Sequence, residues 1–112
     1  MMKRSKRDVF MAIADPTRRS ILVLIATQSM TPNAIAEHFN MSRQAVSKHI
    51  RLLADCDLVT QRQLGREIHY SLEVLKMKEI DKWLDQFREL WEKRFAQLDD
   101  LLTTIKPDKN EN

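Results

Sequence analysis

The sequence contains little cysteine, little glycine and no long apolar segment. The one cysteine, Cys56, cannot form an intrachain disulfide, which favours a reducing compartment such as the cytoplasm. The longest unbroken apolar run covers residues 21–26, far short of the roughly 18 residues that a membrane-spanning helix requires. We therefore expect a cytoplasmic protein without membrane contact, and 112 residues with 43% hydrophobic content fit one compact domain.

Signatures of catalysis and metal binding are also missing from the sequence. There is no glycine-rich phosphate loop, no Ser-His-Asp or Cys-His arrangement with supporting context, and no cluster of metal ligands. We expect no enzyme activity, no cofactor and no metal site. His38 and His69 are assigned surface roles, whereas His49 either orients its helix by a local hydrogen bond or contacts a phosphate.

Basic residues are concentrated in the first two thirds of the chain. Residues 1–75 contain 11 Lys and Arg against 7 Asp and Glu, whereas residues 76–112 contain 8 against 9. This bias suits a polyanionic partner, although many solvated surfaces share it.

Three helices are predicted before residue 40. Apolar spacing indicates a short helix over residues 8–14. Asp15 and Thr31 are good N-cap residues, and each is followed by proline, which is favoured at the first helical position. These caps predict a second helix to about residue 27 and a third that ends at Asn40.

A helix-turn-helix follows from the chemistry of residues 40–54. Asn40 tolerates the left-handed conformation of a tight turn, and Ser42 can cap the next helix. That helix has an apolar face and an opposite face that is polar and basic. The apolar face comprises Ala45, Val46, Ile50 and Leu53, and the polar face comprises Arg43, Gln44, Ser47, Lys48 and Arg51.

The last third of the chain predicts a β-hairpin and then one long helix. Residues 58–64 and 67–72 flank Gly65, and the second segment alternates apolar and polar residues. From about residue 75 to residue 105, apolar residues recur at helical spacing. The expected fold is mainly α with a small β-hairpin: a winged helix-turn-helix with a long C-terminal dimerisation helix. The domain covers residues 8–105, between a basic segment (1–7) and a disordered tail (106–112).

The polar helix and the hairpin tip together form a candidate surface for duplex DNA. Arg43, Gln44 and Ser47 can read base edges in the major groove. Ser42, Lys48 and Arg51 suit phosphates, and the tip offers Arg62, Gln63 and Arg66 to the backbone or the minor groove. The alternatives are that these side chains form only a solvated face, and that the chain is a winged-helix protein-interaction module that does not bind DNA.

The aromatic stripe of the last helix predicts a partner surface. A helix of about thirty residues exceeds what a small three-helix core can cover. We expect a homodimer through Phe10, Ile13, Trp83, Phe87, Leu90 and Trp91, although packing within the monomer is the alternative.

Arg18, Arg19 and Cys56 each allow two interpretations. Arg18 and Arg19 either touch phosphates or have ordinary helix-surface roles. Cys56 is expected to be a small buried or half-buried residue, with redox sensing as the alternative.

Over nearly its whole length the chain resembles the ArsR (arsenic-repressor) family of bacterial winged helix-turn-helix regulators, whose hairpin, the wing, would begin at Leu58-Val59. Residues 15–22, DPTRRSIL, are similar to the start of its second helix, and residues 41–53, MSRQAVSKHIRLL, to its recognition helix. The resemblance implies a dimeric transcription regulator, usually a repressor, whose interface uses the first and last helices. Asp57 stands where such proteins often have glycine. Residues 31–33 lack the family's cysteine pair, so the chain resembles the branch without a metal site, and the inducer is unknown.

Overall fold

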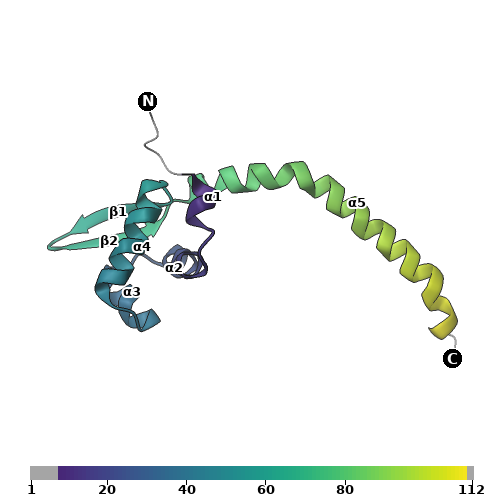
Figure 1. The fold of residues 1–112 in the computed structure, drawn as a ribbon, viewed down its shortest axis with the longest axis horizontal. Helices are drawn as coiled ribbons and strands as arrows, with labels where there is room; N and C mark the ends of the chain where they lie inside the picture. Colours follow the sequence, from purple (N-terminus) through teal and green to yellow (C-terminus); the bar gives the residue numbers. More distant parts are fainter. Residues whose placement is uncertain (1–7, 111–112) are drawn as a thin grey trace. The chain divides into compact units, whose positions relative to one another are not determined.

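The computed structural model describes the backbone of residues 8–110 and the side chains of residues 8–105. By its internal contacts the chain divides into two compact units, Met1–Ile80 and Asp81–Asn112. Four helices and a two-stranded hairpin belong to the first unit, and the second unit contains the long last helix after its first turn (Figure 1). The predicted basic segment, residues 1–7, lies outside the described residues.

The first two helices begin and end close to the predicted positions. Helix α1 is a single turn, Val9–Ala12, and helix α2 covers Pro16–Thr27. The Asp15 side chain caps α2 by accepting a hydrogen bond from the backbone N–H of Arg18, as its position before a proline predicts.

Helices α3 (Pro32–Phe39) and α4 (Arg43–Asp55) form the predicted helix-turn-helix. Asn40 has φ 55° and ψ 45°, the left-handed conformation that lets the chain reverse between the two helices. After α4, Asp57 also has a positive φ, 61°. The aspartate therefore takes the left-handed position for which glycine is better suited.

Strands β1 (Val59–Leu64) and β2 (Glu67–Leu72) form an antiparallel hairpin that projects beside α4 (Figure 1). Val59 lies opposite Leu72 and Leu64 opposite Glu67, so two residues connect the strands. Gly65 has φ 66°, which an L side chain would disfavour in this tight turn. The base of the hairpin is attached to the α2–α3 connection, because Tyr70 N–H donates to the Met30 carbonyl at 2.8 Å.

The core of the first unit draws on helices α1 to α4, on β1 and on the connection between α4 and β1. Its buried residues are Val9, Ala12, Ile21, Leu22, Ile25, Ile35, Ala36, Val46, Ile50, Leu53, Cys56, Leu58 and Val59. This apolar packing holds α4 against the other helices, so that its opposite face stays in solvent.

A short 3-10 helix, Val74–Lys76, leads into helix α5, Met77–Asn110. The predicted helix end at residue 105 is wrong, because α5 continues across Pro107. Proline has no backbone N–H to donate and is disfavoured inside a helix, which is why the helix was expected to end before residue 107. The tail predicted to be disordered is helical up to Asn110, and residues 111–112 lie outside the described residues. Among the described residues, no helix is both long and apolar enough to cross a membrane.

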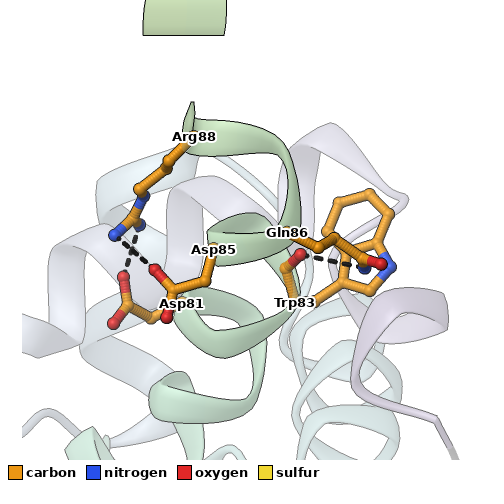
Figure 2. A network of polar contacts seen from close by, with 5 residues as sticks. All are labelled: Asp81, Trp83, Asp85, Gln86 and Arg88. Atoms are coloured by element: carbon orange, nitrogen blue, oxygen red, sulfur yellow. Dashed lines mark hydrogen bonds and ion pairs between the residues drawn. The ribbon is translucent and has the colours of Figure 1, made fainter. Parts of the chain in front are cut away.

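Helix α5 carries ion pairs on one side and aromatic rings on another. Figure 2 shows Arg88 turned toward Asp81 and Asp85, with Trp83 and Gln86 on the far side of the helix. The hydrogen bond to Asp81 raises the pKa of Arg88 above its ordinary value. Trp83 packs edge-on against Phe87, with ring centroids 5.0 Å apart. The helix therefore has one side whose charged groups pair with each other and another side that carries aromatic rings.

Candidate DNA interface

Side-chain N-caps at the start of α3 and of α4 stabilise the helix-turn-helix and fix the direction of α4. The Thr31 hydroxyl oxygen accepts a hydrogen bond from Ala34 N–H at 3.2 Å, and the Ser42 hydroxyl oxygen accepts one from Ala45 N–H at 3.1 Å. Ser42 still has its own hydroxyl hydrogen to donate to a phosphate oxygen. Between the caps, Met41 N–H donates to the Ala36 carbonyl at 3.0 Å and closes the end of α3. The start of α4 is therefore fixed by hydrogen bonds within the motif.

The two faces of α4 lie as predicted. Val46, Ile50 and Leu53 are buried in the core. The exposed residues are Arg43, Gln44, Lys48 and Arg51, and Ser47 is half-buried between the faces. These five side chains line one open hollow along the outer surface of α4. Gln44 and Arg43 are near the start of the helix, the part that a recognition helix presents to base edges.

A cleft between α4 and the β1–β2 hairpin, the wing of the fold, is lined by side chains from both. One part, of about 410 Å³, is lined by Arg43 and Ser47 of α4 and by Arg66 of the hairpin turn. The adjoining part, of about 310 Å³, is lined by Arg51 and by Gln61 and Tyr70 of the hairpin. Arg43, Ser47, Arg51 and Arg66 therefore share one surface with two hairpin side chains.

Gln61 and Tyr70 were not identified from the sequence as site residues. They lie opposite each other in the hairpin register. The alternation of β2 signals that Tyr70 faces one side of the hairpin with Ile68 and Leu72, but it does not reveal that this side faces α4. That relationship comes from the packing of hairpin against helix.

Arg62 and Gln63 differ from Arg66 in their setting. Because successive residues of a strand face opposite sides, Arg62 lies on the side away from Gln61 and Tyr70. Its cross-strand partner is His69, whose Nε2 lies 3.4 Å from a carboxylate oxygen of Glu67. Gln63 donates its amide hydrogen to the Gly65 carbonyl at 3.3 Å, which stabilises the turn and leaves its amide oxygen available. The three predicted tip residues are all exposed, but they do not form one cluster.

Within the described part of the chain, the cations of α4 and the hairpin have no acidic partners. Among the described residues, no ion pair involves Arg43, Lys48, Arg51, Arg62 or Arg66. By contrast, the guanidinium groups of Arg18 and Arg19 donate to backbone carbonyls of residues 11–13. Unpaired cations on α4 and on the hairpin favour a polyanionic ligand, because its phosphates supply the missing negative charge.

The cysteine and two of the histidines considered in the sequence lie outside the cleft. Cys56 is fully buried, as expected. His38 is exposed and lies edge-on to Phe39, in agreement with a surface role. His49 is half-buried. Within the described part of the chain, no three His, Cys, Asp or Glu side chains are grouped as a metal site.

Comparison with known proteins supports a helix-turn-helix protein that binds DNA. A family described as a helix-turn-helix domain matches residues 13–62, from the end of α1 into β1. The chain is 39% identical over 80 residues to the transcriptional repressor SdpR of Bacillus subtilis (strain 168), covering 71% of this chain and 89% of SdpR. It is 31% identical over 77 residues to the arsenical resistance operon repressor of Staphylococcus xylosus, covering 69% and 74% of the two chains.

A solved structure extends the likeness to the fold. An ArsR-like transcriptional regulator from Rhodococcus sp. RHA1 superposes with a TM-score of 0.66 at 30% identity. The superposition covers 83% of this chain and 88% of the other. Together with the helix-turn-helix, the hairpin beside α4 and the relatives above, this match shows that the chain belongs to the ArsR family of winged helix-turn-helix, DNA-binding transcription regulators.

Proposed function

We propose that this repressor binds an inverted-repeat operator as a homodimer, with α4 in the major groove and the hairpin beside it. The unpaired cations of α4 and the hairpin are the observation that carries the proposal. A bound duplex would neutralise them and release counterions from its phosphates. We place the protein in the cytoplasm because its ligand is duplex DNA.

Base reading and phosphate binding are assigned to different side chains. Gln44 and Arg43 reach adenine and guanine edges, since their side chains can donate paired hydrogen bonds in the major groove, and Ser47 can bond either base. The phosphate contacts are assigned to Ser42, Lys48 and Arg51, with Arg62, Gln63 and Arg66 contributing from the wing. These contacts orient the helix but do not specify sequence.

Arg62 and Arg66 contact different parts of the duplex in this arrangement. Arg66 lines the cleft beside α4, so it meets the same backbone strand that Arg51 approaches. Arg62 lies on the other side of the hairpin and meets phosphates further along the duplex. The hairpin would therefore straddle a phosphate backbone at the edge of the minor groove.

The dimer interface is assigned to Phe10, Ile13, Trp83, Phe87, Leu90 and Trp91. Trp83 is 46% exposed, Leu90 50% and Trp91 37%, although such side chains favour burial. At about 1.5 Å per residue the 34 residues of α5 extend roughly 51 Å, which offers a long surface to a second copy. Two-fold symmetry would set the recognition helices about 34 Å apart, one turn of DNA.

Selection from a random duplex pool, followed by sedimentation of the selected complex, tests the proposal. We expect an inverted repeat with two chains per duplex and an affinity that falls steeply with salt. A chain that is monomeric when it saturates DNA would exclude the dimer. No salt-dependent binding to any selected duplex would favour the protein-interaction module instead.

A further inference from the structure

Helix α1 is too short to be stable by itself. It is one turn of four residues, and isolated helices of that length do not form in water. Val9 and Ala12 anchor it in the core, whereas Phe10 and Ile13 are only half-buried and Met11 is exposed. The conformation of this turn therefore depends on contacts from other parts of the first unit.

Two arginines of α2 supply those contacts at the C-terminal end of α1. Arg18 donates from Nε to the Ala12 carbonyl at 2.8 Å and from Nη2 to the Met11 carbonyl at 3.2 Å. Arg19 donates from Nη1 to the Ile13 carbonyl at 2.8 Å. The last carbonyls of a helix lack partners within the helix and attract cations, so this arginine clasp, Arg18 with Arg19, satisfies the end of α1.

The clasp is itself held in place from α2. The backbone N–H of Arg18 donates to the Asp15 carboxylate, which fixes the first turn of α2 from which both arginines extend. At the opposite end of α1, the Cys56 thiol donates to the Asp8 carbonyl at 3.4 Å. The turn that carries Phe10 and Ile13 is thus fastened at both ends by residues outside it.

We propose that Arg18 and Arg19 are positioning residues for dimerisation and do not contact DNA. They hold α1 in the conformation that presents Phe10 and Ile13 to a second copy of the chain. This role rests on the proposed homodimer. If the clasp opens, α1 frays, the dimer weakens, and operator affinity falls because fewer dimers are present, while the DNA surface of each dimer is unchanged.

The experiment compares the double variant Arg18→Gln/Arg19→Gln, which removes two positive charges, with Arg51→Gln, a control that removes one. Both remove positive charge, but Arg51 is an unpaired cation of α4. The dimer dissociation constant is measured by sedimentation, and operator affinity is measured over a range of protein and salt concentrations. Amide hydrogen exchange compares residues 8–14 with residues 43–55.

The double variant should raise the dimer dissociation constant at least about tenfold, because charged hydrogen bonds to α1 are lost. Exchange should accelerate in residues 8–14 and stay slow in α4. Operator occupancy should recover at high protein concentration with an unchanged salt slope. Arg51→Gln should dimerise normally, lower the slope by about one counterion and show no recovery.

Opposite results would contradict the proposed role of Arg18 and Arg19 in dimerisation. Normal dimerisation of the double variant, with a salt slope reduced by about two, would make Arg18 and Arg19 phosphate contacts instead. If the double variant does not fold, Arg19→Gln alone, which removes one exposed hydrogen bond, gives the same readouts on a smaller scale. If the wild-type chain itself sediments as a monomer, the proposed homodimer is wrong, independently of the variants.

Discussion

The carboxylate of Asp15 accepts a hydrogen bond of 2.9 Å from the backbone N–H of Arg18. This bond caps α2 and lowers the pKa of Asp15 below its ordinary value of 3.8. A carboxyl group with a lowered pKa stabilises the folded state above its unfolded pKa, and this contribution is lost as pH falls through the folded pKa. The cap is therefore expected to weaken only at acidic pH, below about 4.

Two substitutions of Asp15 distinguish the contribution of the N-cap hydrogen bond from that of the carboxylate charge. Asp15→Ala should lower the free energy of unfolding by about 1 kcal/mol at neutral pH, because α2 loses an N-cap. Asp15→Asn keeps an oxygen that can cap the helix, so it should be close to wild type at low pH. Urea unfolding from pH 7 to pH 3 should show the difference between wild type and Asp15→Asn shrinking as pH falls. A constant difference would mean that the carboxylate charge contributes nothing.

Gln44→Ala should change sequence preference more than nonspecific affinity. Loss of a bidentate base contact is expected to cost about 1–3 kcal/mol at one operator position. Arg43→Ala should behave in the same way if Arg43 reaches guanine. Affinities for the operator and for a scrambled duplex, measured in parallel, give the comparison. Unchanged affinity and preference in Gln44→Ala would show that this residue does not read bases.

Substitution of the phosphate-binding cations should weaken all sequences alike. Lys48→Ala, Arg51→Ala, Arg62→Ala and Arg66→Ala should each lower the salt slope of binding by roughly one counterion. Stability should be nearly unchanged, since these side chains are exposed. Titrations at several salt concentrations provide the slopes, and a variant that loses only operator affinity would belong with the base-reading residues.

The left-handed conformation of Asp57 predicts a stability difference between two variants. Asp57→Gly and Asp57→Ala lose the same carboxylate, but only glycine accepts φ 61° without a steric penalty from Cβ. Asp57→Gly should therefore be more stable than Asp57→Ala by about 1 kcal/mol in urea unfolding. Equal stabilities would indicate that the turn relaxes when the side chain is shortened.

DNA binding is expected to be independent of metal ions. Soft metals favour thiolate and imidazole ligands, and the one cysteine of the chain is buried. Operator affinity should survive chelator treatment and should not fall on addition of zinc, cadmium or arsenite at low concentration. Stoichiometric zinc in untagged protein, together with lost affinity on adding zinc, would contradict this expectation.

Local chemistry along the chain was sufficient to predict most of the fold. The caps at Asp15, Thr31 and Ser42 each act within three residues, so their sequence signals locate the helix starts without knowledge of packing. The two faces of α4 and the turn at Gly65 were likewise readable, because periodicity and backbone freedom are properties of short segments.

Contacts between distant segments required the tertiary structure. The pairing of Arg18 and Arg19 with α1, the meeting of Tyr70 with α4 and the separation of Arg62 from the cleft depend on how elements pack. The sequence specifies which side chains can bond and which face of an element is apolar, and those properties are local. Which partner each side chain meets is set by the common core, because burial of Val46, Ile50 and Leu53 orients α4 against elements far away in the chain.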